Sequence, residues 1–178
     1  MKQIEVEVRS FIDKKKYEFL MDFFNKNGVN TGSDHQETYY YDGEHDLRIQ
    51  KSKVCSKVWL KKGQMHDECR EEIEIKSDTK DFENLEKLYQ ALGYKVKIKW
   101  FRDRTEFEWK GTKISLDYTR GYGYIVELER MADPKDKDAE LEMIKSQMKE
   151  LGITITPKQE FADRFKDYEK NWERLTRE

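Results

Sequence analysis

The sequence predicts an α+β fold in which helices accompany an antiparallel β-sheet with enough strands to close into a barrel. Short stretches of alternating apolar and charged residues recur along the chain, the first at residues 4–9 and the last at residues 124–130. Such alternation is typical of strands, whose successive side chains point to opposite faces. Most of these stretches follow one another without a helix between them, which favours antiparallel pairing.

The strands are taken from this alternation. It predicts strands at residues 4–9, 36–41, 47–50, 55–62, 68–76, 95–109, 113–119 and 124–130. Lys110-Gly111 forms a hairpin turn between two of them. A closed barrel would leave no exposed strand edge.

Four segments have helical spacing instead. Asp13 caps a helix that runs to about residue 27, and Gly28 suits its end. Apolar residues three and four apart predict further helices at residues 79–92 and 138–151, and from residue 161 onward. The apolar stripe of each helix needs a partner, and the sheet is the available one.

Composition limits the class of protein. The chain has 178 residues, which suits a single domain over residues 1–178. Charged residues make up 40% and apolar residues 36%, yet the formal net charge is −2. A near-neutral chain with periodic apolar residues indicates a folded domain and argues against nucleic-acid binding through a basic surface.

Location is inferred from what the chain lacks. Cys55 and Cys69 are too few for a disulfide scaffold or a zinc motif, and reduced thiols suit a cytoplasmic protein. No stretch approaches the roughly 18 apolar residues of a membrane span, and no signal peptide is evident. We therefore expect a cytoplasmic protein with no membrane partner.

The charged strand faces carry the chemistry. Glu5, Glu7 and Arg9 share one face of the first strand, and Glu127 and Glu129 share one face of the last. Paired carboxylates on two strands can bind a hard divalent cation such as Mg²⁺ or Mn²⁺. Alternatively, these faces simply meet water, as in many antiparallel sheets.

Basic residues favour a binding site. They alternate along the other strands at Arg48, Lys57, Lys61, Arg70, Arg102, Arg104 and Lys113. If the helices cover the apolar faces, the charged faces line the inside of a barrel. Acids and bases buried together are costly unless they bind a ligand, and a metal–triphosphate complex satisfies both. No P-loop or dinucleotide fingerprint is present.

These residues resemble a known family. Glu5-Val6-Glu7-Val8-Arg9 resembles the Glu-x-Glu-x-Lys signature of the CYTH superfamily, the triphosphate tunnel metalloenzymes. Further blocks follow in the family's order: Leu47-Arg48-Ile49, Trp59-Leu60-Lys61-Lys62-Gly63, Arg70-Glu71-Glu72-Ile73-Glu74, Arg102-Asp103-Arg104 with Phe107, Asp117, and residues 123–129.

The resemblance implies a closed eight-stranded antiparallel tunnel with helices outside and assigns roles to its residues. Metal ligands, direct or through water, would be Glu5, Glu7, Asp117, Glu127 and Glu129. Triphosphate would be bound by Arg9, Arg48, Lys61, Arg70, Arg102, Arg104 and, at the tunnel end, Lys158. Arg9, Glu72 and Glu74 complete the catalytic set. Arg9 departs from the signature lysine and cannot act as a base near neutral pH.

The resemblance implies an enzyme that uses Mg²⁺ or Mn²⁺ and acts on a small triphosphate. The leading expectation is a triphosphatase that hydrolyses the terminal phosphoryl group of tripolyphosphate or thiamine triphosphate. A class IV adenylate cyclase that converts ATP to cyclic AMP and pyrophosphate is the alternative. Arg9 in place of lysine also suits a non-catalytic polyphosphate or nucleotide binder. A homodimer is compatible with the sequence, although no residue indicates it.

Overall fold

The computed structural model describes residues 4–61 and 72–177. Their eight strands form one antiparallel sheet in the order β1-β8-β7-β6-β2-β3-β4-β5, accompanied by four α-helices. This confirms the predicted α+β class. No pairing of β1 with β5 is found among the described residues, so the closure of the sheet into a tunnel stays a prediction.

The elements follow the predicted order. The strands are β1 (Ile4–Ile12), β2 (Val29–Tyr41), β3 (Asp46–Lys51), β4 (Ser56–Lys61), β5 (Glu72–Ser77), β6 (Val96–Trp109), β7 (Thr112–Thr119) and β8 (Gly123–Ala132). The α-helices are α1 (Lys14–Asn27), α2 (Phe82–Ala91), α3 (Lys137–Glu150) and α4 (Lys158–Leu175), and 3₁₀ turns at Thr79–Asp81 and Pro134–Asp136 precede α2 and α3.

Two boundaries differ from the prediction. The strand predicted from residue 36 already begins at Val29, because its first residues pair in the sheet although most of them are polar and do not alternate with apolar residues. The last helix begins at Lys158, directly after Pro157, and so includes a turn that precedes the apolar stripe. Cys55 is a free thiol, and the predicted strand residues 68–71, with Cys69, lie outside the described residues.

Two compact units can be described separately. The first comprises the described residues up to Ser33 together with Asp103–Asp167, and the second comprises Asp34–Arg102 with the described residues from Tyr168 onward. Strands β2 and β6 each contribute residues to both units. Each unit has its own hydrophobic core.

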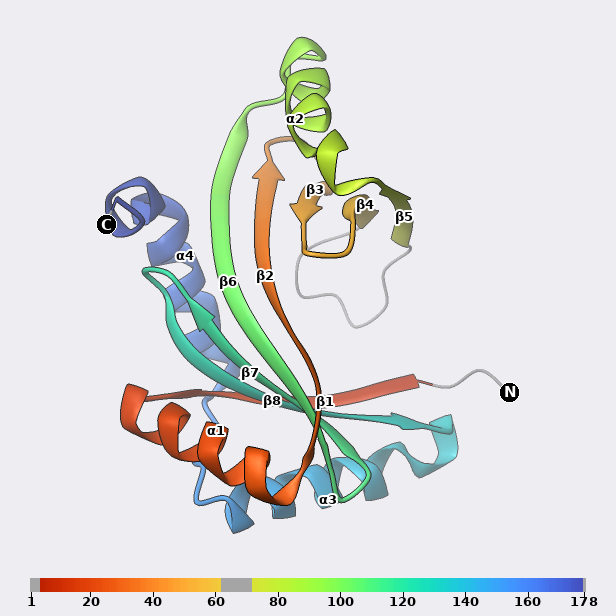
Figure 1. Cartoon of the computed structure of the whole chain (residues 1–178), viewed down its shortest axis with the longest axis vertical. Helices are drawn as coiled ribbons and strands as arrows, with labels where there is room; N and C mark the ends of the chain where they lie inside the picture. The colour runs from red at the N-terminus through yellow and green to blue at the C-terminus, as the bar shows by residue number, and fades with distance from the viewer. Residues whose placement is uncertain (1–3, 62–71, 178) are drawn as a thin grey trace. The chain divides into compact units, whose positions relative to one another are not determined.

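The core of the first unit lies between strands β1, β8 and β7 and the helices α1 and α3, which cover one face of these strands (Figure 1). Val6 and Val8 of β1 point into it, and Phe24 of α1 is fully buried against Phe107 and Trp109. The charged residues that alternate with these apolar ones therefore lie on the opposite face of the strands.

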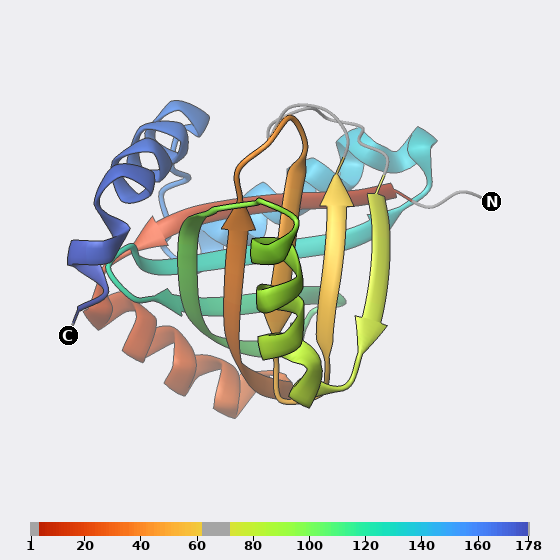
Figure 2. The same cartoon turned by 90° about the horizontal axis from the view of Figure 1, so that it is seen from above.

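The second unit repeats this arrangement with α2. The helix lies over one face of β2, β3 and β4 (Figure 2), where Phe82 packs edge-on against Tyr39 at 5.0 Å between ring centroids. Leu47 and Ile49 of β3 are buried beneath it. In both units helices cover the apolar faces of the strands, as their apolar stripes predict. No helix in the described part of the chain combines the length and the apolar composition that a membrane crossing requires.

Candidate functional site

Four carboxylates line the polar face of β1 and β8. In the antiparallel ladder Glu7 lies directly opposite Glu129, and Arg9 lies opposite Glu127. Glu5 follows on the same face of β1, while Val6 and Val8 point into the core. The structure therefore pairs the two acidic strands, and brings Glu7 and Glu129 to opposite positions of one ladder. Residues opposite one another in a ladder have their Cβ atoms about 5 Å apart, so like charges repel here.

The pKa of Glu7 reports this crowding. Desolvation and, after it, the charge of Glu127 raise the pKa of Glu7 to about 6 from the ordinary 4.5, although the neighbouring Arg9 acts in the opposite direction. Glu5 and Glu129 raise it further. The neighbouring carboxylates thus add to the effect of desolvation on Glu7, and a bound cation would relieve the repulsion among them.

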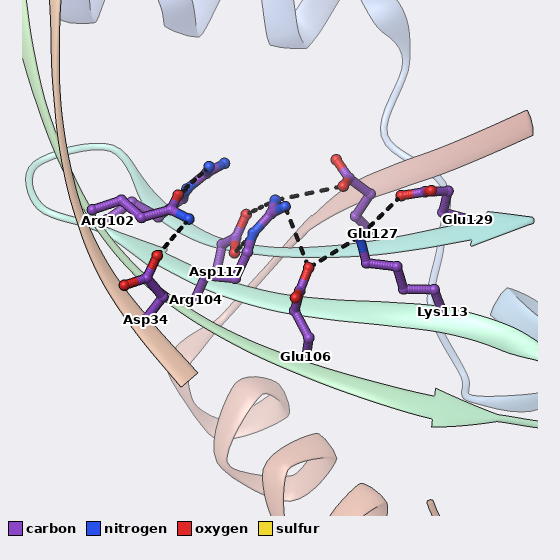
Figure 3. Close-up of polar contacts among 9 residues, drawn as sticks. Asp34, Arg102, Arg104, Glu106, Lys113, Asp117, Glu127 and Glu129 are labelled. Carbon is purple, nitrogen blue, oxygen red and sulfur yellow. Dashed lines mark hydrogen bonds and ion pairs between the residues drawn. The ribbon is translucent and has the colours of Figure 1, made fainter. Parts of the chain in front are cut away.

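Arg104 and Asp117 form the most buried ion pair of this unit (Figure 3). The Nε and Nη2 atoms of Arg104 each donate a hydrogen bond of 2.7 Å to one carboxylate oxygen of Asp117, which is 3% exposed. Nη2 also lies 3.5 Å from the Glu127 carboxylate. Desolvation alone would lower the pKa of Arg104, but the Asp117 and Glu127 charges raise it overall, so Arg104 stays a cation.

Two further residues complete the network: Lys113, which was predicted on a charged strand face without a specific role, and Glu106, which was not predicted. Lys113 of β7 lies 3.1 Å from Glu106 and 3.5 Å from Glu129, measured from Nζ to carboxylate oxygen. Figure 3 shows the resulting chain of charges along the polar face. Glu106 could have been found by the alternation that identified Lys113, because it follows Arg104 at a spacing of two.

The donor set is suited to a hard cation. All candidate ligands are carboxylates, and Mg²⁺ and Mn²⁺ prefer oxygen. Within the described ranges, no three His, Cys, Asp or Glu side chains are arranged as a ready metal site. Both oxygens of Asp117 are already engaged by Arg104, so any role of Asp117 toward a metal is more readily fulfilled through water.

The second unit holds Arg48 and Arg102, two of the arginines predicted to bind phosphate. Arg48 of β3 donates hydrogen bonds of 2.6 and 2.5 Å to the two oxygens of Asp46, and its guanidinium lies over the ring of Tyr40 at 4.3 Å. Arg102 of β6 donates to the side-chain oxygen of Gln36 at 2.9 Å. Arg48 is thus oriented by Asp46 of its own strand and Tyr40 of β2, and Arg102 by Gln36 of β2.

The fifth strand carries further predicted residues. Glu74 lies 3.3 Å from both Lys57 and Lys76. Desolvation raises the pKa of Glu74, but the two lysines outweigh this and lower it overall. Lys61 lies opposite Glu72 in the β4–β5 ladder. The side chains of Lys61 and Glu72 and the whole of Arg70 lie outside the described residues.

The structure thus brings the predicted residues together in two groups. The first unit gathers Glu5, Glu7, Arg9, Arg104, Asp117, Glu127 and Glu129, and the second holds Arg48, Glu74 and Arg102. Lys158 is exposed at the first position of α4. One pocket shared by both groups stays a prediction.

The fold and the site together define the class of protein. It is an antiparallel sheet with acidic and basic side chains on one face of its strands and helices on the other. The CYTH domain model matches residues 3–162, and the chain belongs to this family. Among curated proteins, no sequence matches the chain.

Solved structures share the fold. The PH1012 protein of Pyrococcus horikoshii OT3 is 20% identical with a TM-score of 0.68, covering 87% of this chain and 96% of that one. An adenylyl cyclase candidate from Hippeastrum, described as having a dominant triphosphatase activity, is 16% identical with a TM-score of 0.66, covering 93% and 96%. An adenylate cyclase candidate from Vibrio parahaemolyticus is also 16% identical, with a TM-score of 0.65 and coverage of 92% and 99%.

Proposed function

We propose that the protein is a divalent-metal-dependent enzyme that hydrolyses the terminal phosphoryl group of a small triphosphate. The observation that carries the proposal is the acidic ladder of β1 and β8, where Glu7 faces Glu129 and its pKa is raised to about 6. Arg9 and Arg104 lie on the strand faces that border this ladder. A metal–triphosphate complex requires carboxylates that bind the metal close to basic side chains that bind the phosphate oxygens.

In this proposal Glu5, Glu7, Glu127 and Glu129 hold Mg²⁺ or Mn²⁺, and Asp117 contributes through water. When bound, the metal would neutralise charge on the triphosphate oxygens. Carboxylates that repel one another lose this repulsion as a cation binds, which suits the ladder to this role.

The basic residues bind the phosphate chain in this proposal. Arg9 and Arg104 serve from the first unit, with Lys158 at the start of α4, and Arg48, Lys61, Arg70 and Arg102 serve from the second. Arg9 stabilises charge on the phosphoryl oxygens and does not move a proton, because a guanidinium keeps its proton in proteins. Glu72 and Glu74 shape the site and complete the catalytic set.

The competing reaction uses the same residues. A class IV adenylate cyclase would direct the ribose hydroxyl of ATP at the α-phosphorus and release pyrophosphate, whereas a triphosphatase directs water at the terminal phosphorus. The dominant triphosphatase activity described for the Hippeastrum relative supports hydrolysis as the leading proposal. We further propose that the chain acts as one tunnel domain in the cytoplasm, on tripolyphosphate, thiamine triphosphate or ATP and without nucleic acid or membrane.

Product analysis tests the proposal. Purified protein is incubated with tripolyphosphate, thiamine triphosphate and ATP in turn, with Mg²⁺, with Mn²⁺ and with EDTA. Orthophosphate together with the matching diphosphate, formed only with metal, is the expected result. Cyclic AMP with pyrophosphate would replace the proposal by the cyclase. Binding of tripolyphosphate without any product would make the protein a non-catalytic binder.

A further inference from the structure

An aromatic cluster lies at the end of the polar face of β1. The ring of Phe11 stacks on that of Phe161 from α4, with 4.4 Å between centroids, and the ring of Tyr122 lies 5.2 Å from Phe11. A guanidinium lies over each of the two stacked rings. The guanidinium carbon of Arg9 lies 4.7 Å from the centroid of Phe161, and that of Arg164 lies 4.1 Å from the centroid of Phe11. All five residues belong to the first unit. The cluster connects Arg9, which is predicted to bind phosphate, to α4, where Phe161 lies 152 positions later in the sequence.

The segment before α4 is fixed to β1 by hydrogen bonds. The fully buried Ser10 hydroxyl donates to the Thr154 carbonyl at 2.6 Å and lies 2.9 Å from the Thr156 hydroxyl. The Phe11 amide in turn donates to the Thr156 side-chain oxygen at 3.0 Å. Phe161 itself is 8% exposed. The first turns of α4 are therefore held against the strand end, and the ring of Phe161 has little freedom to move.

We propose that Phe161 is a positioning residue that holds Arg9 in the orientation for binding phosphate. A planar guanidinium that stacks by its face on a ring keeps the N–H donors along its edge available for phosphate oxygens. The guanidinium of Arg9 lies 4.7 Å from the centroid of the Phe161 ring, and its charge also acts on Glu7 of the acidic ladder. The inference rests on the proposed function, since it assigns Arg9 to a triphosphate.

The stack also accounts for arginine at this position. A lysine ammonium has no flat face and no fixed fork of donors, so a buried ring beside it fixes its direction far less. Arg9 of this chain stands where the family signature has lysine, and Phe161 supplies the flat surface that an arginine uses. The substitution of the signature residue and the aromatic residue on α4 thus form one functional unit.

A double-mutant cycle tests the inference by calorimetric titration with tripolyphosphate in EDTA and again with Mg²⁺. The variants are Phe161→Leu, Arg9→Gln and the two combined. Phe161→Tyr keeps the ring and should restore binding. Arg164→Gln removes the other guanidinium of the cluster and is the matched control. Thermal unfolding of each variant verifies that it is folded.

The expected result is that Phe161→Leu weakens tripolyphosphate binding about twofold to fivefold, the size of a cation–π contact at an exposed site. In the Arg9→Gln background the same change should have almost no further effect, because its partner is gone. In turnover assays Phe161→Leu should raise KM more than it lowers kcat.

Two other outcomes distinguish a failure of the proposed function from a failure of the positioning role of Phe161. Absence of tripolyphosphate binding by the unmodified protein overturns the proposed function and this inference with it. Strong binding that Phe161→Leu leaves unchanged, or weakens equally with and without Arg9, overturns the positioning role of Phe161 alone.

Discussion

Arg104 holds Asp117 through two parallel hydrogen bonds of 2.7 Å, one to each carboxylate oxygen. The two residues come from adjacent strands β6 and β7, and Asp117 is almost fully buried. A bidentate pair of this kind fixes both side chains. Arg104 also reaches Glu127, so the pair anchors one end of the charged network to the acidic ladder.

Replacing Arg104 alone should destabilise the fold more than replacing both partners. Arg104→Met leaves a buried carboxylate without its cation, which costs about 3–5 kcal/mol. Adding Asp117→Leu should recover most of that loss, because the uncompensated charge is removed. Urea unfolding of both variants measures the difference. Equal stabilities would show that the pair is not a coupled unit.

An exposed pair is the appropriate comparison. Lys110 and Glu150 form an ion pair whose side chains are each 52% exposed. Lys110→Met should change the free energy of unfolding by at most about 1 kcal/mol, because solvent screens exposed pairs.

The pKa of Glu7 predicts a pH dependence of stability. Folding raises this pKa from 4.5 to about 6, so the folded state binds the proton more tightly than the unfolded state. The stability that protonated Glu7 contributes to the folded state is therefore fully present below about pH 4.5, and it is lost as the pH rises through about 6. In EDTA, the stability gained by Glu7→Gln should be larger at pH 7 than at pH 5. A gain that is the same at both values would contradict the repulsive environment inferred for Glu7.

Phe24 is predicted to be central to the core of the first unit. It is 0% exposed, and its ring lies 5.6 Å from Phe107 and 5.7 Å from Trp109. Phe24→Ala should lower the free energy of unfolding by about 3–5 kcal/mol because it leaves a cavity. Phe19 lies on the same helix but is 55% exposed, and Phe19→Ala should have a much smaller effect. Chemical denaturation compares the two; similar losses would disprove this assignment of the core.

Strand faces could be predicted because alternation is a local property. Glu5, Glu7 and Arg9 share a face whatever their strand pairs with, and the predicted opposition to Val6 and Val8 is found. Strand β2 shows the limit of this signal. Most of its first residues are polar, and they form a strand through pairing with a neighbour, which no local pattern records.

Contacts between distant segments could not be predicted in the same way. The pairing of Arg104 with Asp117 depends on the register of β6 against β7, and the stacking of Arg9 on Phe161 depends on where the segment before α4 crosses β1. Neither register nor crossing is encoded in spacing along one segment. Alternation did contain a signal for Glu106 and Lys113, which share the faces of Arg104 and Asp117.

The most direct test of the central claim is orthophosphate release from tripolyphosphate by the unmodified protein and by the variant Glu127→Gln/Glu129→Gln. With Mg²⁺ or Mn²⁺ the unmodified protein should release orthophosphate, and with EDTA it should not. The double variant should remain folded, with an unchanged or higher melting temperature without metal because repulsion is relieved, yet release none. Release by the double variant at the rate of the unmodified protein would contradict the assignment of the metal to the acidic ladder of β1 and β8.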